Sequence, residues 1–134
     1  MGARKREKAE ERKELRKTEY LAKLNNCTSS PRKMRLIADL IRGERVVKAS
    51  NILRFHKKEA STKMEKLLWS AINNYEEKSG NSWESAELFV KEVKVDGGRM
   101  LKRISPRAQG RAFRVRKRSN HVTLILGTAN QVEN

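Results

Sequence analysis

Cysteine occurs only once in this sequence, at Cys27, so no disulfide can form within the chain. A chain without disulfides suits a reducing compartment. No apolar run approaches the roughly 18–20 residues of a membrane-spanning helix. The N-terminal segment lacks the apolar stretch of a signal peptide, and its five glutamates before Tyr20 are atypical of an organelle transit peptide. We therefore expect a cytoplasmic protein.

Residues that bind metals or carry out catalysis are also scarce. The two histidines, His56 and His121, and the single cysteine lie far apart in the sequence, which does not fit a zinc site. The sequence contains no phosphate-binding glycine loop and no pair of carboxylates in a recognisable catalytic context. We expect no enzymatic activity, no metal and no cofactor.

Acidic residues are missing from one long segment, which runs from Gly97 to Val132. The whole chain of 134 residues has 32 Lys and Arg against 16 Asp and Glu, a formal net charge of +16. Closely spaced cations repel one another, so this segment is either extended in solvent or neutralised by a polyanion. The excess of Arg over Lys favours structured RNA, because the planar guanidinium matches phosphate oxygens and stacks on bases.

Hydrophobic periodicity predicts helices and strands in the rest of the chain. Residues 20–27 alternate as in a short strand, and Ser30-Pro31 is typical of a helix start that Gly43 would end. Two further helices are expected at about 44–55 and 58–77. Strand patterns around the cationic run predict a hairpin over about residues 88–126.

The first strand of this hairpin changes phase. Leu88 and Val90 follow the alternation of a strand, and Val93 and Val95 then alternate on the other parity. Such a shift indicates either a bulge or a strand buried on both faces, and the sequence leaves this choice open.

The two ends of the chain differ from the middle. Residues 1–19 are almost entirely charged and present no apolar face, so we expect a mobile N-terminal extension. Residues 20–127 are expected to form a single domain that includes the hairpin, and residues 128–134 a loose C-terminus.

The predicted helix start at Pro31 carries an electrostatic anomaly. Arg32 and Lys33 lie where the helix dipole prefers anions, and Lys33 takes the place of a capping-box Glu. A phosphate bound at this terminus would explain both cations. The alternative is two tolerated surface charges.

Two segments carry a resemblance. Ser30 to Gly43 reads SPRKMRLIADLIRG, and Leu101 to Ala112 reads LKRISPRAQGRA, followed from Lys117 by KRSNHVTLIL. In this order and spacing, they closely resemble the family of bacterial-type large-subunit ribosomal protein twenty-two. The resemblance covers about residues 20–127, and the charged segment before Tyr20 is longer than the usual start of that family.

The resemblance implies an α+β fold, with three helices packed on a small three-stranded antiparallel sheet and a long protruding β-hairpin. It implies a structural constituent of the large ribosomal subunit that binds and organises large-subunit rRNA, with the hairpin tip lining the nascent-peptide exit tunnel. The implied partners are large-subunit rRNA, neighbouring large-subunit ribosomal proteins and the nascent polypeptide. We expect no DNA, membrane or homo-oligomeric partner, and a place in the cytoplasmic ribosome.

The candidate site residues follow from the residue chemistry and from this resemblance. The tunnel-lining tip is expected at Leu101, Lys102, Arg103, Ile104, Ser105, Pro106, Arg107, Ala108, Gln109, Gly110 and Arg111. The residues expected to bind rRNA are Arg32, Lys33, Arg35, Arg99, Lys102, Arg103, Arg107, Arg111, Arg114, Arg116, Lys117, Arg118 and His121.

Three other functions compete with this interpretation. A basic DNA-compacting or RNA-chaperone protein acting off the ribosome would carry a similar charge. An enzyme acting on RNA would need a metal cluster or an acid–base pair, which the sequence lacks. A membrane-surface protein would need more large apolar residues in the cationic run.

Overall fold

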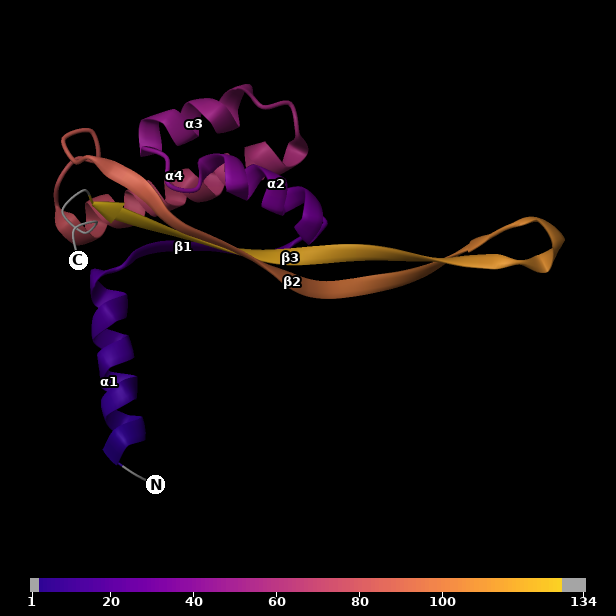
Figure 1. The fold of residues 1–134 in the computed structure, drawn as a ribbon, viewed down its shortest axis with the longest axis horizontal. Coiled ribbons are helices and arrows are strands. Elements are labelled where there is room, and N and C mark those ends of the chain that lie inside the picture. Colours follow the sequence, from indigo (N-terminus) through magenta and orange to yellow (C-terminus); the bar gives the residue numbers. More distant parts are fainter. Residues whose placement is uncertain (1–2, 129–134) are drawn as a thin grey trace.

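The computed structural model describes residues 3–128 and contains a three-stranded sheet, helices on one of its faces and a long β-hairpin (Figure 1). The elements in chain order are α1 (Ala3–Thr18), β1 (Tyr20–Cys27), α2 (Pro31–Ile41), α3 (Val46–Phe55), α4 (Glu59–Ser79), β2 (Leu88–Pro106), the 3-10 turn η1 (Ala108–Gly110) and β3 (Ala112–Thr128).

The sheet has the strand order β1-β3-β2, and both pairings are antiparallel. The last strand in the chain, β3, is therefore the middle strand, paired with β1 from Tyr20↔Leu126 and with β2 from Leu88↔Thr128. This arrangement confirms the predicted α+β class, the three-stranded antiparallel sheet and the hairpin. The predicted loose C-terminus lies outside the described residues, except for Thr128, which ends β3.

Helices α2, α3 and α4 cover one face of the sheet, and the core lies between them (Figure 1). The long helix α4 has an apolar stripe, as the hydrophobic periodicity of the sequence predicts. This stripe faces the core, and its residues between Ala60 and Tyr75 are buried. The other face of the sheet has no helix over it, as antiparallel sheets allow. The largest fully buried side chains are Met34, Ile37, Ile41, Val46, Leu53, Met64, Leu68, Ile72, Val90, Val122, Leu124 and Leu126.

The N-terminal segment adds a fourth helix, α1, to the three that the sequence predicts. Residues 4–14 are all exposed, and α1 projects from the body beyond the start of β1 (Figure 1). Its residues are good helix formers, and an ion pair at helical spacing joins Arg6 Nε to Glu10 at 3.0 Å. The absence of an apolar face thus prevents packing against the core but not helix formation.

A bulge explains the phase shift in β2. The register slips between Val90 and Glu92, so that Lys91 is an extra residue opposite β3. Because of this insertion, Val90, Val93 and Val95 all face the core despite their different parity. Of the two alternatives left open by the sequence, the structure shows the bulge.

A second bulge separates the body from the exposed part of the hairpin. Gly97 pairs with Asn120 and Met100 with Arg118, so β2 has one residue more than β3 between these pairs. The Ser119 hydroxyl donates a hydrogen bond to the Arg99 carbonyl oxygen across this bulge. None of residues 98–119 is buried. We call this exposed segment, Gly98–Ser119, the arm.

Gly98 at the root of the arm has no room for a side chain. A Cβ atom there would lie 2.7 Å from Ser119 Oγ, 3.1 Å from the Ser119 carbonyl carbon and 3.2 Å from the Asn120 backbone nitrogen. At the adjacent Gly97, a Cβ atom would meet nothing within 4 Å. The two neighbouring glycines therefore have different roles, and only Gly98 permits the close approach of β2 to β3.

We expect Gly98→Ala to destabilise the protein by about 1–3 kcal/mol, because the bulge must shift to admit the methyl group. The melting temperature in a thermal denaturation experiment should fall by roughly 3–10 °C. Gly97→Ala is the matched control and should leave the melting temperature nearly unchanged. Equal effects of the two substitutions would show that the close contact at Gly98 is unimportant.

Candidate RNA-binding surface

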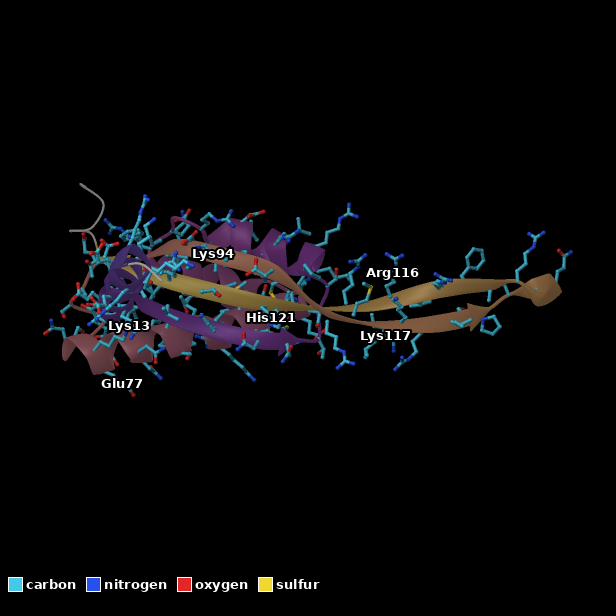
Figure 2. All side chains as sticks on the ribbon, turned by 90° about the horizontal axis from the view of Figure 1, so that it is seen from below. Lys13, Glu77, Lys94, Arg116, Lys117 and His121 are labelled. Carbon is cyan, nitrogen blue, oxygen red and sulfur yellow. The ribbon has the colours of Figure 1, made fainter. Side chains whose placement is uncertain are left out.

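The arm is a two-stranded ribbon whose two faces differ in charge. Residues directly opposite each other in an antiparallel ladder share a face. Figure 2 shows Arg116 and Lys117 on opposite sides of the ribbon, as this alternation requires. One face carries Met100, Lys102, Ile104, Arg114, Arg116 and Arg118, and the other carries Leu101, Arg103, Ser105, Phe113, Val115 and Lys117. The first face has four cations and the second has two.

The cations of the arm are not compensated by acidic groups. The arm has nine Arg and Lys residues and no Asp or Glu. Lys102 lies directly opposite Arg116, an arrangement of like charges that destabilises a sheet. Among the described residues, no ion pair involves any of the arm cations. The charge of the arm therefore opposes its own folding and needs an external anion.

The end of the arm is a tight turn closed by the pair Pro106↔Ala112. Gln109 and Gly110 have φ angles of 59° and 71°, and the Arg107 N–H donates to the Arg111 carbonyl at 2.8 Å. The Arg107 guanidinium lies 5.7 Å from the centroid of the Phe113 ring, which is 61% exposed. This turn lies within the predicted tip, residues 101–111.

The first six residues of the predicted tip, Leu101 to Pro106, lie on the strand that leads to this turn. Leu101 pairs with Lys117 and Ile104 with Arg114, so both are in the regular ladder. Their positions along β2 place Leu101 near the root of the arm and Ile104 near its end. The predicted tip thus consists of a turn and the β2 strand before it.

The N-terminus of α2 presents its two predicted cations to solvent. Ser30 is the N-cap residue, and Pro31 follows it, as the sequence predicts, but the Ser30 side chain makes no capping hydrogen bond. Arg32 and Lys33 are both exposed in the first turn. A cavity of about 550 Å³ adjoins this terminus and is lined by Thr28, Ser29, Ser30, Lys33, Leu36, Lys58, Glu59 and Ala60.

One carboxylate at the rim of this cavity is neutralised by a neighbouring lysine. Lys63 Nζ lies 2.7 Å from Glu59 Oε1, and this hydrogen bond lowers the pKa of the Glu59 carboxyl, assisted by the charges of Lys63 and Lys33. The same hydrogen bond raises the pKa of Lys63. Both groups are therefore ionised at neutral pH, and Lys33 and Lys58 remain as the cations available to an anionic ligand.

Arg35 has a structural contact that the sequence does not reveal. Its Nη2 donates to the Val95 carbonyl oxygen at 3.1 Å, and Arg42 Nη2 donates to the Val93 carbonyl oxygen at 3.1 Å. Arg42 also pairs with Asp39 at 2.7 Å. Arg35, within α2, and Arg42, at its C-cap, therefore fasten this helix to β2. Arg42 was not among the predicted site residues.

His121 lies on the open face of the sheet at the root of the arm (Figure 2). Its Nδ1 accepts a hydrogen bond from the Asn26 backbone N–H at 3.0 Å. This bond requires an unprotonated Nδ1, so the neutral ring carries its proton on Nε2. His121 therefore holds the end of β1 against β3, and its Nε2–H is the group available to a phosphate.

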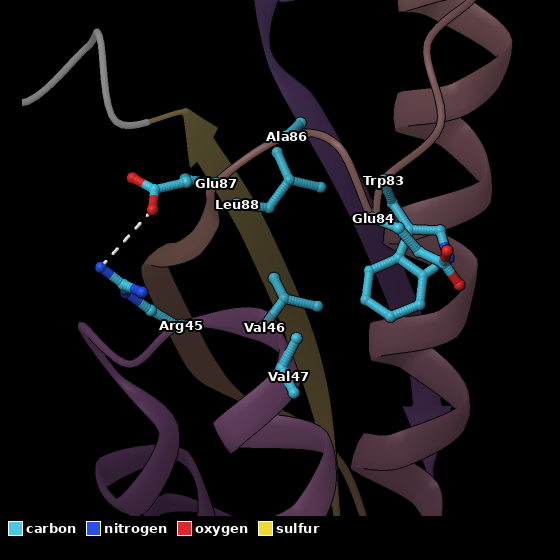
Figure 3. A pocket seen from close by; sticks show the side chains of 8 residues that line it. All are labelled: Arg45, Val46, Val47, Trp83, Glu84, Ala86, Glu87 and Leu88. Atoms are coloured by element: carbon cyan, nitrogen blue, oxygen red, sulfur yellow. Dashed lines mark ion pairs between the residues drawn. The ribbon is translucent and has the colours of Figure 1, made fainter.

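Figure 3 shows a second cavity, which lies beside the start of β2, at the end of the body away from the arm (Figure 1). Its volume is about 220 Å³, and an ion pair of 3.6 Å between Arg45 and Glu87 lies at its edge. Trp83 on its wall contacts Trp69 edge to face, with ring centroids 6.0 Å apart. The lining of this cavity carries one cation and two carboxylates, and the cavity is distant from the cationic surfaces.

The described residues contain neither a metal-binding cluster nor a membrane-spanning helix. Between residues 3 and 128, no group of three or more His, Cys, Asp or Glu side chains is arranged to hold a metal ion. Within the same part of the chain, no helix is both long and apolar enough to cross a membrane. The cationic arm and the α2 terminus therefore dominate the surface chemistry of this molecule.

Sequence comparison identifies the family. A model of the family described as Ribosomal protein L22p/L17e matches residues 22–127, which include β1, the three helices of the body and most of the hairpin.

Curated relatives extend the match over the whole chain. A protein of Flavobacterium johnsoniae named large ribosomal subunit protein uL22 is 63% identical over 134 residues, which cover 99% of this chain and 98% of the relative. Proteins of the same name from Bacteroides fragilis and Porphyromonas gingivalis are 56% and 54% identical, covering 98% and 100% of those relatives and 99% and 100% of this chain. The N-terminal segment lies outside the family match but within the region shared with these relatives.

These matches agree with the resemblance that the two motifs carry, and with a hairpin whose charge calls for a polyanion. The chain belongs to the ribosomal protein L22p/L17e family and is a structural, non-enzymatic component of the large subunit of the cytoplasmic ribosome.

Proposed function

We propose that this protein binds and organises large-subunit rRNA by inserting its arm between rRNA segments while its body docks on the rRNA surface through the α2 terminus. The arm is the observation that carries this proposal. It combines nine cations, no acidic residue and no buried residue in a ribbon that protrudes from the body. Phosphates on both sides would neutralise its two charged faces.

The shape of the arm supports a contact deep within the RNA. Seven β2 residues, from Met100 to Pro106, precede the turn, and a strand rises by about 3.4 Å per residue. The arm thus reaches roughly 20 Å beyond the sheet. An isolated two-stranded hairpin is marginally stable in water, and like charges weaken it further. Burial within folded rRNA would provide the contacts that the arm itself lacks.

The tip of the arm is proposed to line the peptide exit tunnel. Arg107 and the predicted tip residues around it would face the nascent polypeptide or the tunnel wall, together with the exposed Phe113 on the adjoining strand β3. The body would contact neighbouring large-subunit proteins. Both partners follow from the family resemblance, and the exposed turn is compatible with them.

We further propose a division of the chain into an rRNA-bound domain, residues 20–127, and a mobile extension before it, which contains helix α1. The lack of an apolar face on α1 supports this division, because such a helix gains little from packing.

Association with the large subunit tests the rRNA proposal. In sucrose-gradient sedimentation of cell lysate, the protein should remain with the large subunit at high salt, because the arm would be enclosed by folded rRNA. Simple electrostatic binding weakens steeply as salt rises. Loss of the protein from the large subunit even at low salt would contradict the proposal and favour a free nucleic-acid-binding protein.

The substitution Lys102→Glu should affect the free arm and the RNA complex in opposite directions. A glutamate opposite Arg116 replaces a like-charge pair by an ion pair, which should stabilise the arm by about 0.2–1 kcal/mol. In the RNA complex, the same carboxylate should repel phosphates and weaken binding. Trypsin cleavage of the free arm should slow, whereas incorporation into large subunits should fall.

Lys102→Gln is the control for this experiment, since it removes the cation without adding an ion pair. It should weaken incorporation less than Lys102→Glu does. If Lys102→Glu leaves incorporation unchanged, Lys102 does not face rRNA.

A shortened arm tests the tunnel proposal. Removal of the two opposing pairs Lys102↔Arg116 and Arg103↔Val115 deletes two residues from each strand, so the remaining side chains keep their faces. The body should fold with an unchanged melting temperature, and the turn should be withdrawn by about 7 Å. Crosslinks between a photoreactive residue at position 109 and a stalled nascent chain should be lost. Retention of those crosslinks would show that the turn does not define the contact.

A further inference from the structure

A cavity at the root of the arm has the features of a binding site for a single nucleotide. Its volume is about 620 Å³, within the range of small-molecule sites. Asn26 and Thr28, at the end of β1, form one wall. The opposite wall comes from the two strands of the arm and consists of Arg99, Leu101, Lys117, Arg118 and Ser119.

The walls of this cavity offer two kinds of contact. Arg99, Lys117 and Arg118 supply three cations, and among the described residues no ion pair or hydrogen bond involves their guanidinium or ammonium groups. No acidic residue lines the cavity. Leu101, which is 47% exposed, adds an apolar surface between these cations. Thr28 and Asn26 supply short polar side chains on the other wall.

Hydrogen bonds hold the two walls in place without a ligand. Asn26 adopts a left-handed conformation with φ of 54°, and its backbone N–H donates to His121 Nδ1. The fully buried Asn120 donates from Nδ2 to the Ser29 carbonyl oxygen at 2.7 Å. The Ser119 hydroxyl fixes the backbone at Arg99. Because these hydrogen bonds join β1 to the residues at the arm root, ligand binding would lose little free energy in forming the cavity.

The combination of contacts selects the ligand class. An apolar surface suits the face of a nucleobase, amide and hydroxyl groups suit its hydrogen-bonding edge, and cations suit the adjoining phosphates. A base inside a double helix cannot reach such a cavity, whereas bases of loops and bulges can be splayed out. A peptide would find no acidic group here for its own cations and no deep apolar pocket.

We infer that this cavity holds one unpaired nucleotide of the rRNA, with its base against Leu101 and its phosphates on Arg99, Lys117 and Arg118. This inference rests on the proposed rRNA binding and adds a specific contact to it. The nucleotide would lock the arm at its junction with the body, where the bulge at Gly98 sets the direction of the arm. Leu101 then acts in base recognition at the root, apart from the turn.

The test uses ribosomes purified from cells that carry variants of this protein. Base-specific chemical probing with dimethyl sulfate and carbodiimide reports which unpaired rRNA bases are protected. In Leu101→Asp ribosomes, one unpaired base that is protected in the wild type should become several-fold more reactive. The carboxylate would remove the apolar wall and repel the adjoining phosphates.

Val115→Asp is the matched control. Val115 lies on the same face of the arm as Leu101, has a similar exposure of 43%, and is not part of the cavity. This variant should leave the reactivity of that base unchanged. If no unpaired base responds to Leu101→Asp in subunits that still contain the protein, the inference is wrong while the proposed rRNA binding stands. Absence of the wild-type protein from the subunit would instead refute the proposed function.

A photocrosslinking residue at position 28 distinguishes the occupant. A crosslink to an unpaired rRNA nucleotide, the same one that chemical probing identifies, supports the inference. A crosslink to a ribosomal protein would overturn it and assign the cavity to a peptide segment.

Discussion

Pairing along β3 is the interaction on which the rest of the structure depends. The residues of β3 from Asn120 onward form the middle of the sheet, buried under three helices, and the residues before Asn120 form one side of the arm. The arm therefore has no hinge of flexible chain at its base. Its direction is set by the twist of the sheet and by the bulge opposite Ser119, so the packing of the small body determines where a distant turn lies. A defect in the core would thus also misdirect the arm.

Different interactions determine the stability of the body and the stability of the arm. The body has an apolar core, fastened by hydrogen bonds from Arg35 and Arg42 to carbonyl groups of β2. The arm has neither a core nor compensating charges, and its cross-strand neighbours include a pair of like charges. The free energy of folding of the arm therefore depends on the charges in its surroundings. A protein of this kind is complete as a structure only in the presence of its polyanion, which agrees with membership of a ribosomal family.

Much of the fold follows from local patterns in the sequence. The spacing of apolar residues is enough to predict the buried stripe of α4 and the two strands of the hairpin. The Ser30-Pro31 pair is enough to predict where α2 begins. The fourth helix was missed as a stable element because α1 has no apolar face, although its residues favour helix.

Contacts between distant segments could not be read from the sequence. Lys33 and Lys58 line one cavity although most of helix α2 and all of helix α3 lie between them in the chain. Asn26 likewise contacts His121 across the sheet. Periodicity describes which face of an element is buried, but it does not say which carbonyl Arg35 will reach. The roles in RNA binding remain proposals for the same reason, since charge indicates a polyanion without indicating its shape.

The order of the strands has a consequence for how the molecule is made. The middle strand of the sheet follows both of its neighbours in the chain, and β1 and β2 do not pair with each other. Long-range strand pairing must also overcome the entropy of closing the intervening loop, which makes it slow. Every cation of the arm precedes the β3 residues that complete the sheet. During synthesis, all cations of the arm therefore emerge before the residues that close the sheet of the body.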